Sequence, residues 1–191
     1  LNTLRPTRSL AAHRVSGVHG ASFLIRKNLL ESLGGMNSHS FMYYDDVDLS
    51  WMVNLTGYQI YCAPNAVVYH KYELKMNPLK FYYLERNRWF LLLSTLGPIG
   101  FLLTAPALLA TEFLTFSYAI LKGPKYLRAK LKAFLNLREL LPAIAQRRAL
   151  LRDLRTVPDW QVLRGYSVNY TWSQLLHISR SRGQGKRSEL V

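Results

Sequence analysis

The chain has 191 residues, 49% of them hydrophobic, which is enough to bury the core of one domain with an appended segment. Its single cysteine, Cys62, excludes an internal disulfide, and the residues through Val15 lack the apolar stretch that a secretory signal requires. The net charge of +14 is concentrated in residues 122–191, which carry fifteen Lys and Arg against four Asp and Glu. No nucleic-acid reader motif accompanies these charges, so a nucleic-acid-binding protein is the least favoured class.

Short strands and helices alternate over roughly the first ninety residues. Apolar runs bounded by turn residues predict the strands, and apolar side chains at helical spacing predict the helices. In chain order we expect a buried strand at 20–26, a helix at 27–33, a helix at 47–55, strands at 58–62 and 66–69, and a helix from Asn77-Pro78. This alternation predicts an α/β layer architecture.

The stretch from Trp89 to Leu121 contains one charged residue, Glu112. A run of this length can cross the hydrocarbon core of a bilayer, which takes about 20 residues. Pro98 and Pro106 interrupt it, so we expect one tilted span over residues 99–121. A re-entrant hairpin, an interfacial pair of helices and a buried core helix remain open as alternatives.

Residues 122–165 are basic and have leucines at helical spacing. This pattern predicts basic amphipathic helices that suit a membrane surface, with a solvated helix face as the alternative. Residues 166–191 are expected to form a disordered tail. The predicted organisation is therefore an α/β region at 1–88, an apolar membrane segment at 89–121, amphipathic helices at 122–165 and the tail.

Three carboxylates, those of Asp45, Asp46 and Asp48, lie within four positions, directly after Tyr43-Tyr44. Carboxylates this close repel one another unless a cation, a proton or a helix N-terminus offsets the repulsion. The cluster is therefore either a helix cap with a solvated acidic turn or a chemical site.

The acidic cluster is one of seven motifs that follow one another along residues 17–90. They are Gly20-Ala21-Ser22, Arg26-Lys27, Gly34-Gly35-Met36, Tyr44-Asp45-Asp46-Val47-Asp48-Leu49-Ser50-Trp51, Thr56-Gly57-Tyr58, Pro64-Asn65-Ala66-Val67-Val68-Tyr69-His70 and Tyr82-Tyr83-Leu84-Glu85-Arg86-Asn87-Arg88. In this order they resemble the C-terminal half of a family 2 glycosyltransferase of the rhamnosyltransferase-like branch. Residues 91–165 share only the general character of that family.

The resemblance implies the C-terminal half of a GT-A fold, followed by a membrane-associated helical segment. It implies an inverting enzyme that transfers a sugar from a nucleotide-sugar donor to a glycan or lipid-linked acceptor in cell-surface polysaccharide synthesis. Such an enzyme would work at the cytoplasmic face of the cell membrane.

The same resemblance implies roles for single residues. The catalytic base falls on Asp46, and a carboxylate suits that role because it can accept the proton of the attacking hydroxyl. Asp45 and Asp48 would support the base or contact the acceptor, Asp48 through the start of its helix. His70 would contact Mg²⁺ or Mn²⁺, or the diphosphate, and Arg86, together with Arg88, would neutralise the leaving diphosphate.

Two departures from the family pattern limit this interpretation. Met52 stands where members often have Arg, and no Asp-x-Asp or Gly-rich nucleotide site precedes Gly17. We therefore expect the main metal ligands upstream of this chain, and no turnover of sugar nucleotide by the chain alone. The alternative of another class is a non-catalytic, membrane-anchored remnant or interaction module.

Overall fold

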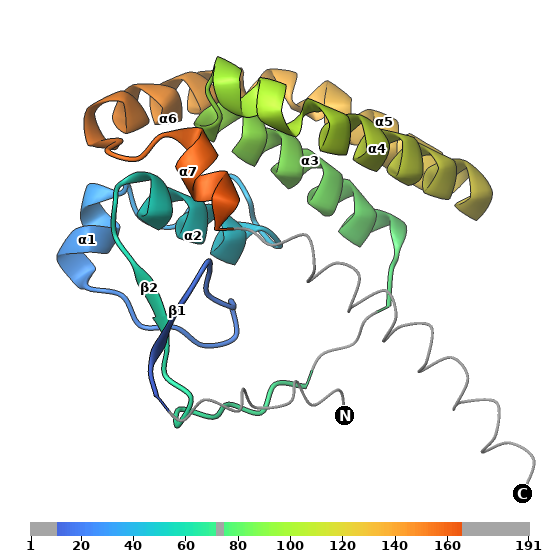
Figure 1. Ribbon diagram of the computed structural model, residues 1–191. Helices are drawn as coiled ribbons and strands as arrows, with labels where there is room; N and C mark the ends of the chain where they lie inside the picture. The colour runs from blue at the N-terminus through green and yellow to red at the C-terminus, as the bar shows by residue number, and fades with distance from the viewer. Residues whose placement is uncertain (1–10, 72–74, 166–191) are drawn as a thin grey trace, which may run out of the picture.

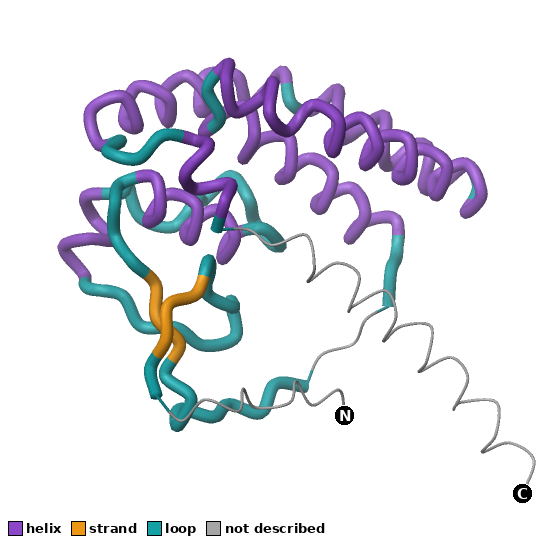
Figure 2. Tube along the Cα trace, in the orientation of Figure 1, coloured by secondary structure: helices purple, strands orange, loops and turns teal. Residues whose placement is uncertain are grey.

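The computed structural model describes residues 11–71 and 75–165. Within these residues the structure is mostly helical, with one two-stranded sheet (Figures 1 and 2). The strands are β1 (His13–Val15) and β2 (Ile60–Cys62), which pair antiparallel with Val15 opposite Ile60. The helices are α1 (Lys27–Ser32), α2 (Asp45–Leu55), α3 (Pro78–Thr95), α4 (Pro98–Lys122), α5 (Pro124–Asn136), the 3₁₀ turn η1 (Arg138–Leu140), α6 (Leu141–Leu154) and α7 (Asp159–Arg164).

The predicted helices are present, and their starting signals are visible in the sequence. Asn77 caps α3 by accepting a hydrogen bond from the Lys80 N–H at 2.8 Å, and Pro78 occupies its first turn. The predicted helix at 27–33 corresponds to α1, and the one at 47–55 corresponds to α2, which begins two residues earlier at Asp45. Pro98 and Pro124 likewise open α4 and α5.

Two of the three predicted strands are absent, and the α/β layering is not seen in residues 11–71 and 75–165. Residues 20–26 form an irregular segment with only an isolated bridge between His19 and Ser22, and Leu24 is fully exposed. Residues 66–69 are also irregular and exposed. Neither segment has a neighbouring strand among the described residues, and a lone strand cannot pair its own N–H and C=O groups. The predicted strand at 58–62 is confirmed in its second half as β2.

The main core lies where α2 meets α3, α6 and α7. Met52, Leu55, Leu96 and Leu151 are almost completely buried there. The carbonyl of Leu55 at the end of α2 accepts the N–H groups of both Thr156 and Val157, each at 3.0 Å. This packing fixes α2, which carries the acidic cluster, against the helices that follow it in the chain.

The apolar stretch 89–121 belongs to two helices rather than to one continuous segment. Its first residues complete α3, where Phe90 and Leu91 are buried. The chain turns at Leu96-Gly97 and continues as α4, which passes through Pro106 without a break. Asp159 of α7 anchors the start of α4 by accepting the Gly97 N–H at 2.8 Å.

By length and composition, α4 is the one helix in the described part of the chain that could cross a membrane, which by itself is weak evidence for a span. The expected amphipathic helices at 122–165 are α5, α6 and α7 with the turn η1. The tail predicted at 166–191 lies outside the described residues. Figure 1 shows α3, α4, α5 and α6 as a helical layer beside the part that holds α1, α2 and the two strands.

Candidate active site

The acidic cluster occupies the first turn of α2. Tyr44 is the N-cap residue and its side chain makes no capping hydrogen bond, while Asp45, Asp46 and Asp48 follow within the helix. The backbone N–H groups of a first helical turn lack intrahelical acceptors and carry partial positive charge. The three carboxylates therefore sit where the helix itself reduces their mutual repulsion.

Asp46 is held by backbone N–H groups on both of its oxygens. Oδ2 accepts the N–H of Gly20 at 2.8 Å, and Oδ1 accepts the N–H of Val47 at 2.8 Å. Glycine at position 20 allows this close approach, because a Cβ there would lie 3.3 Å from Asp46 Oδ2 and would require the carboxylate to shift slightly. The side chain is half-buried, so its position is fixed while part of it remains accessible.

Asp48 points the other way, into the protein. It is 3% exposed, and its Oδ2 accepts a hydrogen bond from the Arg147 guanidinium of α6 at 2.7 Å. Burial raises the pKa of Asp48 above its ordinary value, although Arg147 and the Asn37 side chain oppose the rise by favouring the charged form. The geometry gives Asp48 a contact between α2 and α6, and the sequence offered no signal for its partner Arg147.

The loop before the cluster has an unusual backbone. Phe41, Tyr43 and Tyr44 all have positive φ values, of 59°, 64° and 67°. Non-glycine residues rarely adopt this left-handed region, because Cβ then crowds the following carbonyl. Such strain persists only where surrounding contacts hold it, and it gathers at functional sites.

Asn87 of α3 supplies those contacts. Its buried side-chain amide donates to the carbonyl oxygens of Ser40, Met42 and Tyr43 at 2.8, 2.9 and 2.9 Å. Arg86 adds hydrogen bonds from its guanidinium to the carbonyls of His39 and Ser40. These two residues thus fasten the loop that leads into Asp45 and Asp46.

Arg86 therefore has contacts that differ from those expected of a diphosphate ligand. Besides the loop carbonyls, its guanidinium lies over the rings of Tyr82 and Tyr83 at 5.5 and 4.9 Å. The sequence did show polar residues interrupting an apolar helix at Arg86-Asn87-Arg88, but it did not show that Asn87 faces the acidic loop.

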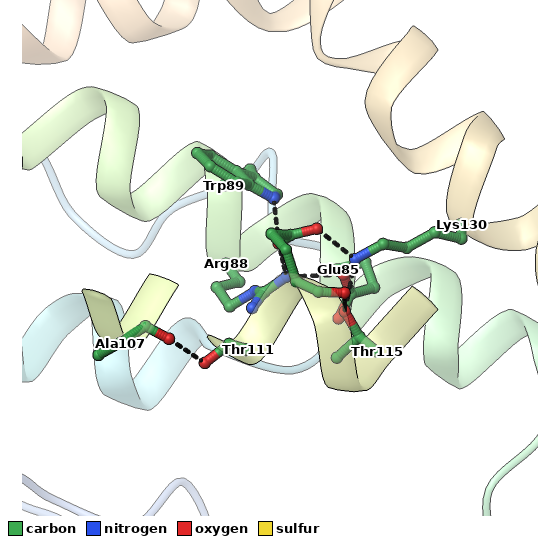
Figure 3. Close-up of polar contacts among 8 residues, drawn as sticks. Glu85, Arg88, Trp89, Ala107, Thr111, Thr115 and Lys130 are labelled. Carbon is green, nitrogen blue, oxygen red and sulfur yellow. Dashed lines mark hydrogen bonds and ion pairs between the residues drawn. The ribbon is translucent and has the colours of Figure 1, made fainter. Parts of the chain in front are cut away.

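Arg88 belongs to a buried cluster of four charges, and its contact with the diphosphate stays a prediction. Glu85 and Arg88 of α3 meet Glu112 of α4 and Lys130 of α5 (Figure 3). Arg88 Nη2 lies 2.7 Å from Glu85 and 2.5 Å from Glu112, and the fully buried Lys130 pairs with both glutamates. Two positive and two negative charges compensate each other here, and the cluster holds α3, α4 and α5 together.

His70 lies in an exposed segment, and its ring centroid is 6.0 Å from that of His19. His19 directly precedes Gly20, the residue that binds Asp46. The structure therefore brings His70, His19 and Asp46 to one neighbourhood, although the sequence had assigned no role to His19. Within residues 11–71 and 75–165, no group of three or more His, Cys, Asp and Glu side chains could hold a metal ion. His70 could supply one ligand, and the other ligands would have to come from elsewhere.

Comparison with protein families gives a match to glycosyltransferase like family 2 over residues 4–91. Comparison with curated proteins and with solved structures found no match. The matched range contains the acidic cluster, its loop and the part of α3 that carries Arg86 and Asn87. The match supports a glycosyltransferase-type function, with a nucleotide-sugar donor and an acceptor as the general substrates. Residues 4–91 of this chain are thus similar to part of the domain of the family 2 glycosyltransferases.

Proposed function

We propose that this chain provides the acceptor side and the catalytic base of an inverting glycosyltransferase of the GT-A type. One observation carries the proposal: Asp46 is half-buried and oriented by two backbone N–H groups, at a helix start that follows a strained loop. A helix cap alone would not require three left-handed residues before it. Strain of this kind gathers at functional sites, and a base must be held in a fixed position because transfer depends on the geometry between base and attacking oxygen.

In this mechanism Asp46 accepts the proton of the acceptor hydroxyl as its oxygen attacks the anomeric carbon of the donor sugar. The bond from that carbon to the nucleoside diphosphate breaks, and the diphosphate leaves with the electron pair. Each carboxylate oxygen has two lone pairs, so each can hold its backbone N–H and still face a proton. Asp45 would contact the acceptor, and Asp48 would support the base by anchoring α2 to α6 through Arg147.

The donor side is proposed to lie near His19 and His70. His70 would contact the diphosphate or a Mg²⁺ or Mn²⁺ ion, whose charge would stabilise the leaving group. The described residues do not assemble a metal site of their own, so most ligands would come from a nucleotide-binding region. Arg86 holds the loop before Asp45 through the carbonyls of His39 and Ser40, and its contact with the diphosphate stays a prediction.

The acceptor is proposed to be a glycan or lipid-linked saccharide of cell-surface polysaccharide synthesis, used at the cytoplasmic face of the membrane. The apolar helix α4 and the basic residues after it support a membrane location. A lipid-linked acceptor would place its sugar close to the surface that the enzyme occupies.

The test is Asp46→Asn, which keeps the shape of the side chain and an oxygen for the Gly20 N–H. Transfer should fall by roughly 10²–10⁴-fold, the usual contribution of a general base, while donor binding is retained. The assay is run on the chain joined to a nucleotide-binding region, since we expect no transfer by residues 1–191 alone. Asp153→Asn, which changes an exposed acid on α6, is the matched control. A near wild-type rate for Asp46→Asn would refute the base assignment. A lack of transfer by the unmutated joined protein would instead favour a non-catalytic interaction module.

A further inference from the structure

The outer face of α4 carries large apolar side chains along its whole length. Ile99, Leu102, Leu109, Phe113 and Ile120 are between 64% and 75% exposed, and they recur every three, four or seven residues. This spacing places them on one side of the helix. We call this surface the α4 apolar face. A soluble protein rarely leaves so long an apolar surface uncovered, so the face is expected to have a partner.

The inner face of α4 is already committed to the protein. Glu112 and Thr115 point into the charge cluster, where Lys130 Nζ lies 2.8 Å from Glu112 Oε2 and 2.7 Å from Thr115 Oγ1 (Figure 3). Trp89 Nε1 of α3 also donates to Glu112 at 3.0 Å. The helix is therefore fixed along its middle to α3 and α5. Among the described residues, the α4 apolar face stays exposed, as do Leu103, Leu114 and Leu121 beside it.

Exposed basic side chains lie on the neighbouring helix. Lys122 ends α4, and Lys125, Arg128 and Lys132 are exposed on α5, which packs against both α3 and α4. Lys132 Nζ lies 5.8 Å from the ring centroid of Tyr82 on α3. An apolar helix face with cations beside it has the chemistry of a membrane surface that bears anionic lipid. A second copy of the chain would instead bring like charges together.

We propose that the α4 apolar face lies in the plane of an anionic membrane surface, inserted among the lipid headgroups and upper acyl chains, and does not cross the bilayer. Crossing would take Glu112 and its partners to about the middle of the hydrocarbon, or separate them. It would also take the exposed cations of α5 into lipid, where charged side chains are strongly disfavoured. The in-plane position leaves the cluster within the protein and the cations at headgroup level. This inference rests on the membrane location proposed above, but not on the chemistry assigned to Asp46.

The first experiment is flotation of the purified chain with vesicles of phosphatidylcholine and phosphatidylglycerol, compared with phosphatidylcholine alone. The triple variant Leu102→Gln, Leu109→Gln, Phe113→Gln should bind the anionic vesicles at least tenfold more weakly than the wild type. The matched control changes three apolar residues with large exposure far from α4: Leu24→Gln, Val67→Gln and Val68→Gln. The control should bind as the wild type does, and circular dichroism should show equal helix content in all three proteins.

Unchanged binding by the α4 triple variant would overturn the proposal. A wild-type dimer that the triple variant converts to a monomer, with no lipid binding by either, would also overturn it and assign the face to a second copy. Replacing Lys125, Arg128 and Lys132 by Gln should remove the preference for anionic vesicles while leaving the fold intact.

The second experiment separates an in-plane helix from a spanning one in membranes of cells that produce the full chain. In a Cys62→Ser background, single cysteines are placed at the exposed positions Pro98 and Lys125, beside the two ends of α4. A membrane-impermeant maleimide should label both from the same side. Labelling from opposite sides would overturn the in-plane position but keep the membrane location. Recovery of the chain in the soluble fraction would contradict the membrane location itself, and neither result bears on transfer by Asp46.

Discussion

Asn87→Asp is the sharpest test of how the acidic loop is held. The change keeps the size of the side chain but replaces the amide nitrogen, which donates to the carbonyls of Ser40, Met42 and Tyr43, by an oxygen. The amide nitrogen carries two hydrogens for these three carbonyls, so its contacts amount to two net hydrogen bonds of about 1 kcal/mol each, and the variant should lose at least about 2 kcal/mol of unfolding free energy. Left-handed backbone costs roughly 1–2 kcal/mol per non-glycine residue, so Phe41, Tyr43 and Tyr44 together store about 3–6 kcal/mol. The support and the strain are therefore of the same order.

The free energy of unfolding is measured by urea denaturation, and the state of the loop by limited digestion with chymotrypsin, which cleaves after aromatic residues. Asn87→Asp should be cleaved faster after the aromatic residues at positions 41–44. The control is Asn136→Asp, because the Asn136 amide donates to the Tyr82 hydroxyl at 2.8 Å and that hydroxyl can donate to a carboxylate in its place, so the variant should lose less than about 1 kcal/mol. Equal destabilisation by the two variants, with unchanged cleavage, would refute the account of the loop.

Three further predictions follow from single contacts. Lys130→Met should cost about 3–5 kcal/mol of unfolding free energy, because it removes a buried cation that pairs with both Glu85 and Glu112. Adding Glu85→Gln to this variant should recover part of the loss in the same urea assay. Burial raises the pKa of Asp48, so the folded state holds its proton to higher pH than the unfolded state does. Wild-type stability should therefore fall, relative to Asp48→Asn, as the pH rises from about 3.9 through the raised pKa, and stay level above it. Gly20→Ala should displace Asp46, whose oxygen would lie 3.3 Å from the new methyl, and lower transfer with little change in melting temperature.

Local signals in the sequence predicted the helices better than the strands. The Asn77-Pro78 start of α3 and the glycines after α1 and α2 act within one turn of the chain, so they can be recognised without knowing the fold. The strands predicted at 20–26 and 66–69 had the composition of strands but no partner among the described residues. Strand formation depends on a neighbour that is distant in sequence, and composition does not reveal it. The pairing of β1 with β2 across almost fifty residues was missed for the same reason.

The sequence identified the acidic residues of the candidate site but not the distant residues that hold them in place. Asp45, Asp46 and Asp48 lie in the first turn of α2, within the range of the family match over residues 4–91, and their roles stay predictions. Asn87 holds the loop before the cluster from about 40 positions away in the sequence. Arg147 holds Asp48 from about 100 positions away. A hydrogen bond across such a separation leaves no periodic pattern, so only the folded structure could identify it.

Residues 85–88 of α3 contact both the charge cluster and the loop before Asp45, a connection that the sequence did not predict. Consecutive residues on a helix point in directions about 100° apart, so Glu85 and Arg88 reach the charge cluster while Arg86 and Asn87 reach the acidic loop. Glu112 ties α4 to the first pair, and the second pair holds the backbone that presents Asp46. One helical turn therefore connects the proposed membrane surface to the proposed base. If α4 rests in the membrane plane, the same rigid turn sets how far the base stands from the acceptor lipid, and a lipid-linked acceptor of fixed reach would suit that geometry better than a free sugar.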